Sequence, residues 1–123
     1  MRGLAIFALA LLIPALLIPV SPGFAHAFLE KADPPVGSEI ANSPPRVSIT
    51  FTEGVEPLFS TIEVQGANGS AVAVGKPQVA PDNDKVLSVV VPKLPPGTYT
   101  VNWHVTSVDT HKTEGNFQFT VAH

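Results

Sequence analysis

Apolar and polar side chains alternate with a period of two along most of this chain after residue 25. Val47, Ile49 and Phe51 alternate with polar residues, a pattern typical of a half-buried strand. The same alternation recurs at 61–65, 99–105 and 117–121. Apolar runs at 71–74 and 86–91 predict two more strands, the second of them central in its sheet. With a short strand at 28–31, the pattern predicts about seven strands.

Proline, glycine and asparagine fall between these runs, as expected for turns: 34–37, 44–45, 66–69, 81–84 and 95–97. No stretch after residue 25 has a helical period. The chain is therefore predicted to be all-β, an immunoglobulin-like sandwich or a small Greek-key barrel.

Residues 1–25 have the layout of a secretory signal peptide. A basic start is followed by an apolar run from Leu4 to Val20, and the small residues Gly23 and Ala25 predict cleavage after Ala25. The alternative is a membrane anchor, but the run is interrupted by Pro14 and Pro19, and a span requires roughly 20 apolar residues. We therefore expect an exported protein whose single domain comprises residues 26–123.

The composition of residues 26–123 limits the partners and the metal ligands that this domain can have. Six Lys and Arg remain against ten Asp and Glu once Arg2 is removed, a formal net charge of −4, which argues against nucleic acid as a partner. The chain has no cysteine, and its one methionine is Met1, so residues 26–123 contain no sulfur. Any metal bound there must be held by nitrogen and oxygen. No phosphate loop, zinc-finger spacing or nucleophile with a plausible base is present.

Cleavage after Ala25 would make His26 the first residue, and its free amine and imidazole can then chelate one metal ion. Asp109 and His111 are the second candidates, because residues two apart in an extended segment project to the same face. They continue the register of the predicted core residues at 99–105, where an unpaired charge is costly. We therefore expect the segment to leave the sandwich near Ser107, at a rim that His26 can reach.

On spacing alone, a polar loop in which Asp109 caps a turn explains this motif equally well. The histidine at the start of a sulfur-free exported domain favours the metal site. The other histidines have simpler interpretations: His104 is expected to face solvent, and His123 to end a mobile tail. Trp103 and Tyr99 are expected in the core, with the Tyr99 hydroxyl in a tyrosine corner.

Five stretches of the chain, taken in order, carry a resemblance to a known family: 26–29, 33–38, 47–53, 94–103 and the Ser-x-Asp-x-His segment 107–111. Through them the chain resembles the CopC family of periplasmic copper-binding proteins. It implies one Cu(II) ion bound by the His26 amine and imidazole, the His111 imidazole and an Asp109 oxygen. Glu53 matches an acidic residue near the site in some members. The methionine-rich loop of some members is missing, which argues against a second, Cu(I) site.

The function that these features imply is that of an extracytoplasmic Cu(II)-binding protein for copper resistance or homeostasis. Such a protein, expected to be a monomer and not an enzyme, would sequester copper or deliver it to an inner-membrane copper transporter of the CopD type. One alternative is a copper monooxygenase-like enzyme, although so small a domain offers little area for a polysaccharide. Another is a metal-free immunoglobulin-like interaction module, since such sandwiches host many functions.

Overall fold

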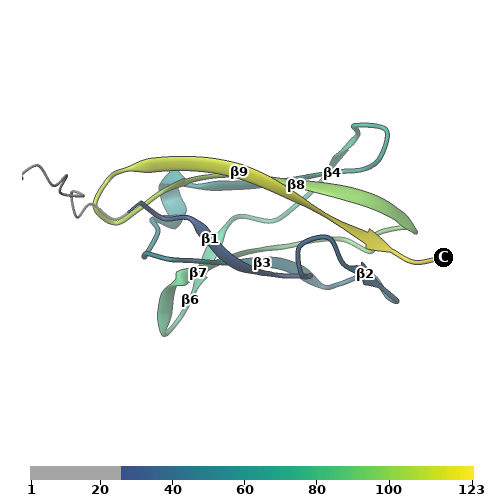
Figure 1. The fold of residues 1–123 in the computed structure, drawn as a ribbon, viewed down its shortest axis with the longest axis horizontal. Coiled ribbons are helices and arrows are strands. Elements are labelled where there is room, and N and C mark those ends of the chain that lie inside the picture. Colours follow the sequence, from purple (N-terminus) through teal and green to yellow (C-terminus); the bar gives the residue numbers. More distant parts are fainter. Residues whose placement is uncertain (1–25) are drawn as a thin grey trace, which may run out of the picture.

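Two β-sheets make up residues 26–123, the part of the chain that the computed structural model describes (Figure 1). The predicted signal peptide, residues 1–25, lies outside the described residues. The strands are β1 (Leu29–Asp33), β2 (Glu39–Ile40), β3 (Arg46–Phe51), β4 (Thr61–Gln65), β5 (Ala71–Val72), β6 (Gln78–Ala80), β7 (Asn83–Val90), β8 (Gly97–Thr106) and β9 (Lys112–Val121). A 3-10 turn, η1 (Pro57–Phe59), is the one helical element in residues 26–123. No helix in residues 26–123 is long and apolar enough to cross a membrane.

The strand order is β1-β3-β7-β6 in the four-stranded sheet and β2-β9-β8-β4-β5 in the five-stranded sheet. All neighbouring strands are antiparallel except β2 and β9, which are parallel. The two sheets face each other without closing into a barrel in the described part of the chain (Figure 1). The all-β prediction is confirmed. Of the two architectures predicted, residues 26–123 form the sandwich and not the barrel.

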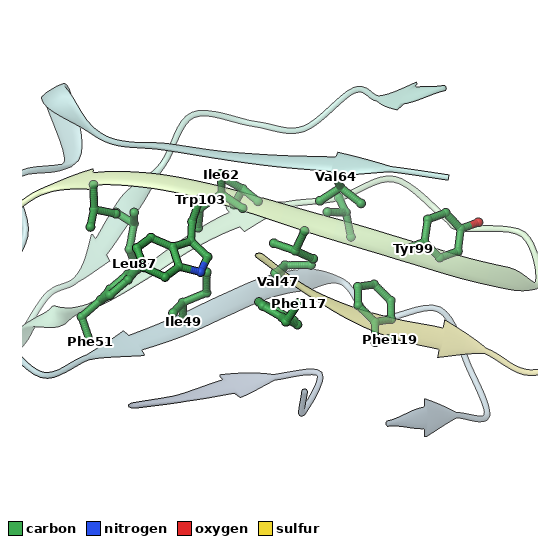
Figure 2. Packing of buried hydrophobic residues seen from close by; sticks show 14 of the residues in the cluster. Val47, Ile49, Phe51, Ile62, Val64, Leu87, Tyr99, Trp103, Phe117 and Phe119 are labelled. Atoms are coloured by element: carbon green, nitrogen blue, oxygen red, sulfur yellow. The ribbon is translucent and has the colours of Figure 1, made fainter. Parts of the chain in front are cut away.

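The core lies between the sheets and is made of the inward half of each alternating strand (Figure 2). Val47, Ile49 and Phe51 of β3 are fully buried. Across from them, β8 and β9 contribute two rows that the alternation predicted: Tyr99, Val101, Trp103, Val105, Phe117, Phe119 and Val121. The predicted core is therefore confirmed.

Aromatic residues tie the two long strands of this core together. The Tyr99 ring stacks on Phe119 at a centroid distance of 5.7 Å, and the Tyr99 hydroxyl donates to the carbonyl of Pro95 at 2.5 Å, which confirms the tyrosine corner. Phe51 of β3 and Trp103 of β8 form a T-shaped pair with their ring centroids 5.2 Å apart. Trp103 also lies opposite Gly115, where no side chain stands in its way.

Two strands were missed by the hydrophobic pattern. β2 and β6 have two and three residues, too few for an alternation to register, and they are held by backbone pairing to β9 and β7. The strand predicted at 71–74 is limited to Ala71–Val72. β7 begins before the apolar run and lies between β3 and β6, an interior position as predicted.

The start of β1 and the connection between β8 and β9 lie at the same end of the sandwich, opposite to the C-terminus (Figure 1). The histidines that the sequence singled out, His26 and His111, therefore belong to one end of the molecule. We call this end the rim and define it by residues 26–28, 52–54 and 107–111.

Candidate metal centre

A tight turn joins β8 to β9 and takes the chain out of the core. The Ser107 amide donates to the carbonyl of His111 and the Thr110 amide to the carbonyl of Ser107, each at 2.8 Å. Thr110 at the tip has φ +74°, a left-handed conformation that is costly for a β-branched residue. The side chains of Asp109 and His111 emerge 42% and 45% exposed. The segment thus leaves the sandwich at Ser107, as the register predicted.

The Asp109 carboxylate is held from within the same turn. Its Oδ1 accepts a hydrogen bond from the hydroxyl of Ser107, a residue with no solvent exposure. The same oxygen lies 3.3 Å from Nδ1 of His111. The hydrogen bond from Ser107 is the main reason that the pKa of Asp109 lies below its ordinary value; desolvation opposes it, and contacts with His111 lower the pKa further.

Two threonine hydroxyls, one from each sheet, hold the segment that carries His26. After β3, Thr52 Oγ1 donates to the His26 carbonyl at 3.1 Å and accepts from the Phe28 amide at 3.0 Å. On β9, Thr113 Oγ1 donates to the Ala27 carbonyl at 2.5 Å. The methyl group of Ala27 is fully buried. The segment is therefore anchored across the end of the sandwich, between the two sheets.

This anchoring brings the His26 imidazole against that of His111. The ring centroids lie 4.7 Å apart with the planes tilted by 50°. On its other side the His26 ring meets Phe28 at 5.9 Å. The structure thus brings together three of the four site residues that the sequence predicted: His26, Asp109 and His111.

The spacing of the two rings suits a shared ion. Two imidazoles with nitrogen–metal bonds of about 2.0–2.1 Å keep their ring centroids roughly 4.5–6 Å apart, which includes the observed separation. Nitrogen and oxygen donors of this kind suit Cu(II) and its neighbours in the first transition row.

In the described residues, however, no group of three or more His, Cys, Asp or Glu side chains converges closely enough to hold a metal. Asp109 Oδ1 is turned toward Ser107 and His111. The three side chains therefore lie close together without converging on one point.

Glu53 lies at the same rim by its backbone. It follows Thr52, which contacts His26, and precedes Gly54, whose carbonyl accepts from the Val108 amide at 2.9 Å. The Glu53 side chain is half-buried. No hydrogen bond or ion pair in residues 26–123 joins its carboxylate to Asp109 or to either histidine of the rim.

The remaining histidines lie elsewhere. His104 faces outward from β8, as expected, and its Nε2 lies 3.3 Å from the carboxylate of Glu114 on β9. A cavity of about 460 Å³ beside this pair is lined by Phe59, His104, Glu114 and their neighbours. His26, Asp109 and His111 do not line it. His123 is exposed at the opposite end of the sandwich.

Three hydroxyl residues that shape the rim were not predicted as functional: Thr52, Ser107 and Thr113. Ser107 opens the Ser-x-Asp-x-His segment, so its position was visible but its role was not. The two threonines carry no local signal, because their partners, the carbonyls at 26 and 27, are far away in the sequence.

Comparison with known proteins shows which family the chain matches. The chain matches the CopC domain over residues 29–122, which includes Glu53, Asp109 and His111 and begins just after His26. It is 35% identical over 116 residues to Protein YobA of Escherichia coli (strain K12), covering 94% of this chain and 92% of that protein.

Two further matches carry copper in their names. Copper transport protein CutJ of Bacillus subtilis (strain 168) is 35% identical over 99 residues, which cover 80% of this chain and 18% of CutJ. The crystal structure of PcoC, a methionine-rich copper resistance protein from Escherichia coli, superposes with a TM-score of 0.70 at 32% identity, covering 79% of this chain and 99% of PcoC.

Proposed function

The chain belongs to the CopC domain family, and on this premise we propose that it binds one Cu(II) ion at an N-terminal histidine exposed by export and cleavage. The protein then acts outside the cytoplasm, in the periplasm, in copper resistance or homeostasis. CutJ is named for copper transport and PcoC for copper resistance, and neither for a reaction, so we assign this chain no enzymatic activity.

The observation that carries this proposal is the contact between the His26 and His111 rings at 4.7 Å. These residues come from opposite ends of the domain sequence, and hydrogen bonds from Thr52 and Thr113 hold the segment that carries His26 at the rim beside His111. Two imidazoles beside a carboxylate form a donor set that is typical of a metal site.

The donors of the site are the amine and imidazole of His26, the imidazole of His111 and an oxygen of Asp109. Glu53 is a further candidate, placed at the rim by its backbone. With no sulfur in residues 26–123, the site offers only nitrogen and oxygen, which favour Cu(II) over Cu(I). The absence of methionine from residues 26–123 contrasts with PcoC, which is described as methionine-rich.

The ion is cargo in this proposal, either sequestered or passed to a membrane partner. Asp109 and His111 are nearly half exposed, so a partner protein has access to the donors. The similarity to a small part of CutJ, a much longer copper transport protein, supports delivery to an inner-membrane copper transporter of the CopD type. We propose that the protein acts as a monomer.

A titration of the exported protein with Cu(II) tests the proposal. Mass analysis should first show that the exported chain begins at His26. We then expect one Cu(II) per chain by d–d absorption, and an affinity at least about tenfold lower when one alanine precedes His26, since even outer partners of metal ligands contribute 10–100-fold. An alanine added after His123 is the matched control and should leave binding unchanged. Equal affinity of the two extended proteins would refute the N-terminal site.

A further inference from the structure

We infer that the membrane partner which receives the ion docks beside the rim, on the exposed side chains of η1 and the cavity between η1, β8 and β9. We call this region the docking surface and define it by Leu58, Phe59 and the cavity residues 104–106 and 112–114. The partner segment that fits it presents an apolar side chain next to a basic one. The inference rests on the proposed function, in the form in which the ion is delivered and not only sequestered.

Large apolar side chains are exposed mainly at the metal-site end of the molecule. Six are exposed in residues 26–123, and four of these lie at the rim or in η1: Phe28, Leu58, Phe59 and Val108. Leu58 and Phe59 are the most exposed of all, at 90% and 72%. The other two, Val36 and Val90, lie in the turn after β1 and at the end of β7, away from the rim. Single exposed apolar residues are ordinary, but a group at one end of a protein marks a surface for another molecule.

Backbone contacts hold η1 against the base of the turn that carries the candidate metal donors. Val55 bridges to Ser107, and the Glu56 amide donates to the carbonyl of Thr106 at 2.8 Å. The Thr106 hydroxyl donates to the carbonyl of Phe59 at 3.0 Å. Figure 1 shows η1 as a short teal coil near the connection between β8 and β9. No residue of η1 is buried, so its apolar side chains are fixed beside the metal site without being part of the core.

The cavity of about 460 Å³ extends from η1 across the end of β8 to the start of β9. Phe59 lines one side of it, and Lys112 and Glu114 line the other. Lys112 pairs with Thr106 in the last rung of the β8–β9 ladder, and the residues between them, 107–111, form the turn of the metal site. Binding pockets span roughly 300–1,000 Å³. The cavity is therefore large enough to take up an apolar side chain of another protein, directly beside the ion.

The charge of this end decides between the possible occupants. One ammonium, that of Lys112, stands against four carboxylates in the rim, before η1 and in the cavity: Glu53, Glu56, Asp109 and Glu114. The neighbouring Asp84 and Lys85 of β7 add no net charge. The surface stays acidic when a Cu(II) ion adds its two positive charges. It is therefore repelled by anionic lipid headgroups and by a second copy of itself, and it attracts a basic protein surface.

Photo-crosslinking in the cells that export the protein tests the inference. The crosslinking amino acid p-benzoylphenylalanine replaces Leu58, whose 90% exposure means that the change leaves the core intact. In the matched control it replaces Val90, which is 52% exposed at the end of β7 away from the rim. We expect an inner-membrane copper transporter, identified by mass spectrometry, as the main product at position 58 and no such product at position 90. Any other main product at position 58, whether a phospholipid, a second copy or an unrelated protein, would overturn the inference, as would no product or equal products at both positions.

A charge reversal then tests the basic character of the partner. Glu114→Lys changes a side chain that lines the cavity and is 75% exposed. Glu39→Lys is the matched control, with the same change in net charge on exposed β2, away from the rim. We expect the crosslinking yield at position 58 to fall about two- to fivefold with Glu114→Lys and to stay unchanged with Glu39→Lys. Equal yields in the two variants would refute the chemistry that we assign to the partner.

A Cu(II) titration of the same proteins separates the inference from the function on which it rests. All of them should bind Cu(II) like the wild type, because none of the changed residues is a candidate donor. If the wild type binds Cu(II) but gives no transporter product at position 58, the docking surface is refuted and the metal site stands. If the wild type binds no Cu(II), the proposed function fails, while the product at position 58 still shows whether a membrane partner docks on this surface.

Discussion

Replacing Gly115 by alanine should destabilise the sandwich through a single contact. Gly115 on β9 lies directly opposite Trp103 on β8. A Cβ at this position would stand 2.5 Å from Cζ2 and 2.9 Å from Cε2 of the Trp103 ring, far inside van der Waals contact. Trp103 is only 5% exposed, and its ring packs against that of Phe51 at a centroid distance of 5.2 Å, so the indole has little room to turn away.

The magnitude follows from two opposing terms. Overpacking a buried ring costs about 1–3 kcal/mol. Replacing glycine restricts the unfolded chain and offsets about 0.4–1 kcal/mol of this cost. We therefore expect a net loss of about 1–2 kcal/mol in the free energy of unfolding, which lowers the Tm of a domain of this size by roughly 5–15 °C.

Urea unfolding followed by tryptophan fluorescence measures this loss, because Trp103 is the one tryptophan of the chain. Gly75→Ala is the matched control: its Cβ would meet nothing closer than Val90 at 3.6 Å, an ordinary contact. We expect that variant to lie within about 0.5 kcal/mol of the wild type.

A second experiment repeats the substitution in a Trp103→Phe background, where the smaller ring removes the clash. Unfolding of these variants is followed by circular dichroism. In that background Gly115→Ala should cost less than in the wild type, a coupling that a double-mutant cycle measures. The reasoning is refuted if Gly115→Ala is as stable as Gly75→Ala, or if its cost is the same with phenylalanine at position 103.

Three further predictions concern single side chains. The pKa of Asp109 is lower in the folded than in the unfolded state, so the ionised carboxylate stabilises the fold at any pH above the unfolded pKa of about 3.9. This stabilisation is lost as the pH falls through the folded-state pKa. Urea unfolding should therefore show Asp109→Asn less stable than the wild type at pH 7, with the difference vanishing in acid. Tyr99→Phe, which removes the bond to the Pro95 carbonyl, should lower the free energy of unfolding by about 0.5–1.5 kcal/mol in the same assay. His104→Ala removes only an exposed pair with Glu114, so calorimetry should show stability within about 0.5 kcal/mol of the wild type and unchanged Cu(II) affinity, whereas His111→Ala should lose that affinity.

The long strands and their buried faces were predictable because a strand buried on one face must alternate. β3 follows this rule along its length, and β8 and β9 follow it over 99–105 and 117–121, where their inward residues form the core. The first half of β9, residues 112–116, has no apolar alternation and was not predicted. β2 and β6 were not predictable, since strands of two and three residues are defined by the partner's backbone and not by their own side chains.

The sequence by itself determined the all-β class, the core rows, the absence of sulfur from residues 26–123 and the outward turn that exposes Asp109 and His111. These follow from local periodicity and from the cost of burying charge. Only the tertiary structure decided that the His26 ring lies against His111 and that Asp109 is turned toward Ser107. Thr52 and Thr113 create the first arrangement from two different sheets, and a buried hydroxyl creates the second. Such contacts depend on how distant segments meet, which no local pattern of side chains encodes.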